Sequence, residues 1–308
     1  LDNADKVEVV RGAESALYGS DAVAGVVQIF THRGTTRRPQ LTLIGDAGSF
    51  STGRGSAQLS GLAGRFDYSA AFTYFQTNGQ GVNNRFLNRT LSSNFGWRFS
   101  ETDRLRLALR NNSSDAGIPG QTLLEPPNLD QHNRLDNFSA NLSWEFHTGS
   151  HWQHRLAGTE SRSKQLFDNR LSDFGSSNPA GPVFCDVPVG GLFCDFPFTA
   201  KNDFNRAGLQ AQSSFLARGG SFTAGYQYEV ENASLSALGG AHARRNNQAG
   251  FLDARLQPLP RLTLGAGVRA EANDNFGTRV VPRAGAALAL RHGGDFWGST
   301  RLRLSYGQ

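Results

Sequence analysis

The sequence VEVVRGAESALYGSDAVAGVVQIFTHR, residues 7–33, decides how the rest of the chain is interpreted. A β-prone, valine-rich run opens the stretch and ends at Gly12. Residues 15–18 can form one helical turn that Gly19 would stop, and residues 22–31 form a second apolar strand. The stretch therefore predicts a small αβ element, whereas the rest of the chain predicts only strands, turns and loops.

The composition excludes several classes of protein. The chain has 308 residues, no methionine and a formal net charge of +5. Its start contains neither an initiator methionine nor a signal segment, so we expect an internal piece of a longer protein. No apolar run is long enough for a transmembrane helix, which needs about 18 residues. The arginines are spread over many predicted strands without a basic cluster, so we expect no nucleic-acid partner.

Apolar and polar residues alternate over most of the chain after residue 39. Residues 104–110, RLRLALR, place three leucines on one face and three arginines on the other. Residues 66–76, 89–100 and 137–147 alternate in the same way. Counting such runs gives about thirteen strands, each long enough to cross a bilayer when tilted.

The connections and the tryptophans favour a membrane barrel. Short turns at one end of the predicted strands alternate with longer connections at the other, as in outer-membrane barrels. The four tryptophans, Trp97, Trp144, Trp152 and Trp297, all lie next to short turns. Tryptophan prefers the membrane interface, and a soluble sandwich has no reason to gather it at one end. The apolar face is therefore expected to face lipid.

Residues 7–33 resemble the end of the plug domain of TonB-dependent outer-membrane receptors. The resemblance rests on Val7-Glu8-Val9, Arg11-Gly12, Ser15-Ala16-Leu17-Tyr18-Gly19, Asp21-Ala22, Gly25-Val26-Val27 and Ile29. Later segments are similar to barrel strands of the same receptors, most of all to cobalamin-type receptors, although siderophore receptors share these motifs.

The resemblance implies a fold and a division of the chain. The fold is all-β: an antiparallel transmembrane β-barrel, present as about 13 of about 22 strands, with the C-terminal piece of an αβ plug domain. Residues 1–34 would end the plug and residues 35–308 would begin the barrel. The plug motif residues are expected to maintain the fold rather than bind a ligand; they are Arg11, Gly12, Ser15, Tyr18, Gly19 and Gly25.

The resemblance also implies active import across the bacterial outer membrane. The ligand would be a bulky metal chelate, such as cobalamin or an iron–siderophore. The partners would be outer-membrane lipid and a TonB-type energy-coupling complex. The sequence contains no catalytic motif, metal-binding motif or dinucleotide site, so we expect neither an enzyme nor a bound cofactor. The alternatives are a passive porin-like channel, which would lack the plug signature, and a soluble β-rich binding module.

Two further expectations concern single residues. Cys185 and Cys194 lie close together in CDVPVGGLFC, which predicts a disulfide that closes a small loop in an oxidising compartment. The alternation predicts lipid-facing Leu105, Leu107, Leu109, Phe138, Leu142 and Leu304, and lumen-facing Arg106, Asn141 and Arg303. Leu107→Arg should then impair assembly, and Arg106→Leu should be milder because a wet lumen tolerates an apolar side chain.

Overall fold

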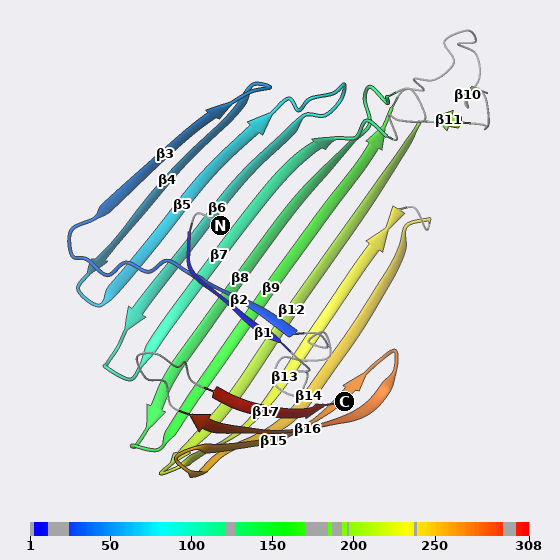
Figure 1. Ribbon diagram of the computed structural model, residues 1–308. Coiled ribbons are helices and arrows are strands. Elements are labelled where there is room, and N and C mark those ends of the chain that lie inside the picture. Colours follow the sequence, from blue (N-terminus) through cyan, green and yellow to red (C-terminus); the bar gives the residue numbers. More distant parts are fainter. Residues whose placement is uncertain are drawn as a thin grey trace.

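The architecture is one large, curved antiparallel sheet with a small hairpin against its concave side (Figure 1). The computed structural model describes residues 3–11, 25–120, 127–170, 184–186, 193–195, 197–236, 239–291 and 300–307. The large sheet has thirteen strands, as the alternation predicted, and its strands are ordered as they follow one another along the chain. Among the described residues, no helix is long and apolar enough to span a membrane.

The thirteen strands form the wall of the molecule. They are β3 (Gln40–Gly48), β4 (Thr52–Ala63), β5 (Phe66–Thr77), β6 (Phe86–Arg98), β7 (Arg104–Gly117), β8 (His132–Thr148), β9 (Trp152–Asn169), β12 (Phe198–Ala217), β13 (Gly220–Leu235), β14 (Ala241–Leu259), β15 (Leu262–Asn273), β16 (Gly277–Arg291) and β17 (Thr300–Gly307). β3 and β17 are the two edges of this sheet and do not pair with each other, so the wall is open.

Two short antiparallel pairs accompany the wall. β1 (Ala4–Arg11) pairs with β2 (Gly25–Thr31). This β1–β2 hairpin crosses in front of the middle wall strands in Figure 1. β10 (Phe184–Asp186) pairs with β11 (Phe193–Asp195) between β9 and β12. The expected helical turn at residues 15–18 lies outside the described residues.

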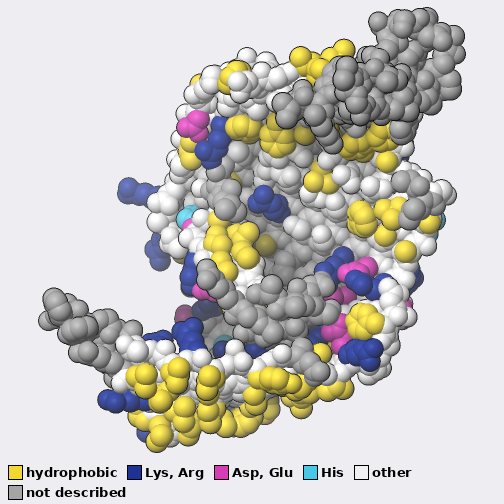
Figure 2. Space-filling view, turned by 45° about the vertical axis from the view of Figure 1, so that its right-hand side comes forward, with side chains coloured by type: hydrophobic (Ala, Val, Ile, Leu, Met, Phe, Trp, Pro, Cys, Tyr) yellow, Lys and Arg dark blue, Asp and Glu magenta, His cyan; other side chains and the backbone are white. Residues whose placement is uncertain are grey.

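The wall has an apolar outer face and a polar inner face. The side chains buried in the described residues are mostly polar, and the buried apolar ones are only Ala71, Ala157, Ala249 and Phe251. Large apolar side chains are instead exposed, among them Leu142 and Leu304 at 47% and 67%. Hydrophobic side chains gather along the lower edge in Figure 2, whereas charged side chains gather in the hollow above it. This arrangement is the reverse of a soluble β-sandwich, whose apolar faces meet inside.

The register fixes which residues share a face. Leu107 pairs with Leu142, and Arg106 pairs with Ser143, so neighbouring residues of β7 project to opposite sides of the sheet. Trp97, Trp144 and Trp152 lie at the short-turn end of the wall, exposed by 46%, 39% and 44%. The indole N–H of Trp144 donates to Asp103 Oδ1 at 2.6 Å. Trp297 lies outside the described residues.

Several wall strands extend further than the alternation predicts. The pattern in β7 fades after residue 110, but the strand continues to Gly117 and pairs with His132 of β8. From the sequence, one of the longer connections is predicted over about residues 274–281; this is wrong, because β15 ends at Asn273 and β16 begins at Gly277. Above the apolar band the outer face carries polar side chains, so the backbone ladder continues without the sequence signal.

Gly34 joins the β1–β2 hairpin to the wall. The chain passes so close to β4 here that a Cβ atom on Gly34 would lie 2.0 Å from the carbonyl oxygen of Gly61. Two residues later, the carbonyl oxygen of Thr36 accepts a hydrogen bond from the Leu62 N–H at 2.8 Å. Only glycine permits this approach, so the direction in which the chain leaves the lumen depends on Gly34.

Candidate functional site

Side-chain hydrogen bonds attach the ends of the β1–β2 hairpin to the inner face of the wall. Asn3 Oδ1 accepts hydrogen bonds from Gln58 Nε2 at 3.2 Å and from Ser69 Oγ at 2.9 Å. Asn94 Nδ2 donates to Thr31 Oγ1 at 2.6 Å. Asn3, Ser69 and Asn94 are all buried, so the hairpin covers this part of the wall.

An ion pair on β5 and β7 lies beside this contact. Arg106 binds both carboxylate oxygens of Asp67, with distances of 3.0 Å and 3.1 Å. The same guanidinium donates to Asn94 Oδ1 at 2.5 Å, so Asn94 connects the ion pair to Thr31. Gly96 lies between the strands, and a Cβ atom there would come within 2.3 Å of Asp67 Oδ2. The glycine therefore leaves the space that the ion pair occupies.

A cavity of about 450 Å³ separates β2 from the wall. Its charged lining is mostly basic and consists of Arg33, Arg104, Arg106, Arg155 and Glu145. Burial and the neighbouring Arg106 lower the pKa of the Arg33 guanidinium, which lies outside the membrane-spanning strands. Glu145 lies 3.7 Å from Arg155 across β8 and β9. The lumen next to the hairpin is therefore positively charged.

The inner face of β12–β16 carries a series of acid–arginine pairs. Arg206 pairs with Glu229 at 2.9 Å, and Arg245 pairs with Glu231 on the next strand. Further along, Arg269 pairs with Glu271 at 2.7 Å, and Arg269 is only 1% exposed. Buried charges of this kind require such partners, because an isolated charge is strongly disfavoured away from water. The lumen acids are therefore structural partners of arginines rather than general acids or bases.

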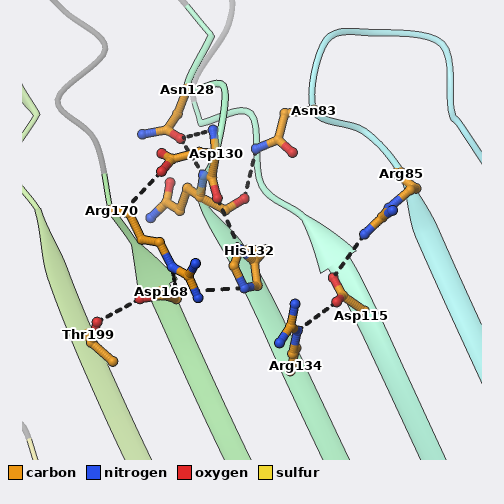
Figure 3. A network of polar contacts seen from close by, with 11 residues as sticks. Asn83, Arg85, Asp115, Asn128, Asp130, His132, Arg134, Asp168, Arg170 and Thr199 are labelled. Carbon is orange, nitrogen blue, oxygen red and sulfur yellow. Dashed lines mark hydrogen bonds and ion pairs between the residues drawn. The ribbon is translucent and has the colours of Figure 1, made fainter.

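A second polar network holds the long-loop end of the wall together (Figure 3). Asn128 Oδ1 accepts the backbone N–H groups of Asp130 and Gln131 at 3.1 Å and 2.6 Å, and its amide donates to Asn169 Oδ1 at 3.0 Å. The loop after β7 is thereby attached to the end of β9. Arg134 of β8 donates to Asp115 of β7 at 2.8 Å nearby.

Asp168 is the centre of the rest of this network. It is 3% exposed and accepts hydrogen bonds from Thr199 Oγ1 and Arg170 Nε, both at 2.6 Å. His132 Nε2 lies 3.9 Å from the same carboxylate. Because Asp168 is already paired with neutral and cationic donors, it fixes the base of the loop that follows β9. No group of three or more metal-ligating side chains occurs in the described part of the chain.

The structure locates only some of the site residues expected from sequence. Gly25 begins β2 opposite Arg11 and has a φ of 148°, a backbone conformation that favours glycine. Gly12, Ser15, Tyr18 and Gly19 lie outside the described residues, as does the side chain of Arg11. Cys185 and Cys194 stand opposite each other in the β10–β11 register.

The sequence did not predict the residues that attach the hairpin to the wall. Asn3 and Thr31 lie at the outer ends of the two apolar strands, where a single polar residue gives no distinctive pattern. Arg33 and Gly34 follow the second apolar strand, and the sequence pattern predicts only that the strand ends there. Arg106 was predicted to face the lumen, and the structure places its guanidinium on that face, against Asp67 and Asn94.

The wall matches a known family over almost its whole length. The family model described as "TonB dependent receptor-like, beta-barrel" matches residues 35–308. The chain belongs to the TonB-dependent receptor family. These receptors are transporters of the outer membrane rather than enzymes, which agrees with the exposed apolar face of the wall.

Solved receptors have the same fold at low sequence identity. The siderophore receptor PirA from Pseudomonas aeruginosa superposes with a TM-score of 0.70 at 18% identity, covering 94% of this chain and 47% of PirA. The ferric yersiniabactin uptake receptor FyuA from Yersinia pestis superposes with a TM-score of 0.70 at 16% identity, covering 94% of this chain and 50% of FyuA. The copper transporter OprC superposes with a TM-score of 0.70 at 11% identity, covering 94% of this chain and 50% of OprC. The chain thus spans about half the length of these receptors.

Proposed function

We propose that this chain forms the end of the plug and the first part of the barrel of a receptor that imports a metal chelate. In this division, residues 1–34 belong to the plug and residues 35–308 to the barrel. The family model begins at residue 35, directly after the tight passage at Gly34, which supports the boundary. A TonB-type complex would supply the energy from the periplasmic side.

The contact between the β1–β2 hairpin and the wall carries the proposal. A passive channel requires an open lumen, whereas here a hairpin covers buried polar residues of the inner face. The attachment consists of hydrogen bonds, each worth a net of about 1 kcal/mol. Water can replace such bonds when the hairpin moves, because the inner face is polar. A segment held in this way is stable at rest and can be displaced by a pull.

The ligand class is proposed from two sources. The structures that superpose on the chain include receptors for siderophores and a transporter of copper. The lumen beside the hairpin is lined by four arginines and one acid, which favours an anionic complex over a cationic one. We therefore propose a metal chelate such as an iron–siderophore, with cobalamin as the second candidate from the sequence motifs.

The test is a reversible lock between hairpin and wall in the intact receptor. Thr31→Cys with Asn94→Cys replaces a 2.6 Å hydrogen bond by a disulfide. We expect uptake of radiolabelled ferric siderophores and cobalamin to stop while surface binding remains, and a reductant to restore uptake. Loss of uptake without recovery would indicate damage rather than a lock.

A matched control lies on the same inner face. Ser56→Cys with Thr73→Cys joins two hydroxyl positions 3.1 Å apart on β4 and β5, which are already paired within the wall. This bond leaves the hairpin free, so uptake should continue. If both cysteine pairs leave uptake unchanged after complete oxidation, the hairpin does not move during transport and the proposal is wrong.

A further inference from the structure

Two adjoining grooves cross the outer face of β9, β12 and β13. The lower groove has a volume of about 340 Å³. Ala140, Gly158 and Ala207 form its floor, and its sides include Leu142 and Leu209. The groove is mostly apolar and lies on the face that is exposed to lipid, so an apolar chain can enter it.

Gly158 keeps the lower groove open. A Cβ atom on Gly158 would meet only Leu209 Cδ2, at an ordinary contact distance of 3.6 Å. The surrounding backbone therefore does not require glycine at this position, although glycine in a strand interior weakens the strand. Such a position is typical of a site where another molecule approaches closely.

The upper groove continues the lower one and has charged side chains in its lining. Glu160 and Val230 line the lower groove, and the next outward positions on their strands, Arg162 and Asn232, line the upper one. The upper groove has a volume of about 440 Å³. Its ionisable lining residues are Arg162, Lys164, Asp203, His242 and Arg244.

Two cations of the upper groove are free to bind an anion. Arg162 already donates to Glu160 at 2.7 Å. Lys164 and Arg244 are both exposed, and neither forms an ion pair within 4.0 Å with another residue in the described part of the chain. Asp203 pairs in register with Lys164 and is the one acid in the lining. The groove therefore places two cations, which have no ion-pair partner among the described residues, beside one acid.

The two grooves lie at different depths in the membrane. Trp152 marks the short-turn interface, and Arg162 is further along the same strand, β9. A tilted strand advances about 2.5 Å per residue along the membrane normal, so about ten residues cover the ~25 Å apolar band. Arg162 and Lys164 thus lie at the outer headgroup level, and Gly158 lies beneath them in the outer leaflet.

We propose that the two grooves form one binding site for a phosphate-bearing lipid of the outer leaflet. An acyl chain would lie in the groove above Gly158, and the lipid phosphate would bind Lys164 and Arg244. Charge complementarity supports the phosphate, and the apolar groove directly below supports the acyl chain. The site is independent of the imported ligand, because it lies on the opposite face of the wall from the lumen.

Native mass spectrometry of the intact receptor in detergent tests the site. The probes are bisphosphorylated lipid A, lipid A without its phosphates, and inorganic phosphate. We expect the bisphosphorylated lipid to remain bound, and the other two probes to bind far more weakly. In the Lys164→Gln/Arg244→Gln variant its affinity should fall about 10- to 30-fold, since each cation near a lipid surface contributes roughly one kcal/mol.

Gly158→Leu and Arg89→Gln complete the test. Gly158→Leu fills the lower groove without altering charge, so it should weaken binding of the bisphosphorylated lipid several-fold. Arg89 lies on the outer face in the same cross-strand row as Lys164 but does not line either groove, so Arg89→Gln should change nothing. The proposal is overturned if Arg89→Gln weakens binding as much as the double variant. It is also overturned if the Gly158→Leu variant binds the bisphosphorylated lipid as tightly as the unmodified receptor does, while its heat-modifiable gel shift shows that it is folded.

Discussion

The lower and upper halves of the wall use the same backbone ladder under different conditions. Near the short turns, leucines and tryptophans dominate the outer face, and most polar groups lie on the lumen side. Near the long loops, charged residues occupy the outer face as well, as Arg134 and Asp115 do. Lipid imposes strict alternation on the lower half, whereas water on both sides of the upper half leaves the side chains free to build networks.

The largest effect on folding is expected from a comparison of the same charge at two positions on the outer face of β7. Leu107→Arg introduces a cation at the lipid-facing middle of the wall and should cost about 2–4 kcal/mol. Ser113→Arg places the same cation on the same face of the same strand, above the apolar band, and should assemble normally. The heat-modifiable gel shift from outer-membrane fractions measures both variants. Equal folding of the two would show that the lower half does not face lipid.

The next largest loss of stability is expected from a substitution on the inner face of the lower half. The sequence predicts that Arg106→Leu is mild, but in the structure Arg106 is the partner of Asp67, which is 7% exposed. Removing the arginine leaves a carboxylate without its cation, which should cost about 2–3 kcal/mol. Adding Asp67→Asn should recover part of this loss. Urea unfolding of the refolded receptor in detergent measures the free energy of unfolding of each variant. If the double variant is no more stable than Arg106→Leu alone, the pairing of Arg106 with Asp67 is contradicted.

In the upper half, a lost ionic contact should act locally. Asp168→Asn weakens the bonds from Arg170 and Thr199 and should loosen the base of the loop after β9, without affecting barrel assembly. Limited proteolysis of intact cells should show faster cleavage in the loops on either side. Asp136→Asn, an exposed change on neighbouring β8, serves as the control and should not alter cleavage. A loss of the gel shift in Asp168→Asn would mean that the upper network supports the whole wall.

The smallest effect on the wall is expected from the two cysteines. Their opposed positions in β10 and β11 support the proposed disulfide. Maleimide labelling of the unreduced protein should find no reactive thiol, and labelling after reduction should find two. Reduction should leave the gel shift unchanged, because the pair lies in the connection between β9 and β12. Two thiols that react without reduction would refute the disulfide.

The same contrast explains what the sequence predicts and what it does not. The alternation in β5, β7 and β8 predicts both the strands and their faces, because lipid tolerates few exceptions. Above the bilayer that constraint ends, so the alternation does not predict how far β7, β8 and β14 continue. The contacts of Asn3 and Thr31 could not be predicted, because they depend on how the hairpin lies against the wall. Asp67 and Arg106 carry the right charges, but only the register brings them together.

The strictly sequential order of the wall has a consequence for how it is assembled. Every pair of neighbouring strands in the wall is also consecutive in the chain, except the β9–β12 pair. Most new hairpins close loops that are shorter than the connection between β9 and β12, so the entropy lost at each of these steps is small. The sheet can therefore grow by adding one hairpin at a time to an open edge. We therefore expect the pairing of β12 with β9 to be the slowest step in this order, because the chain between them must first bring its two ends together.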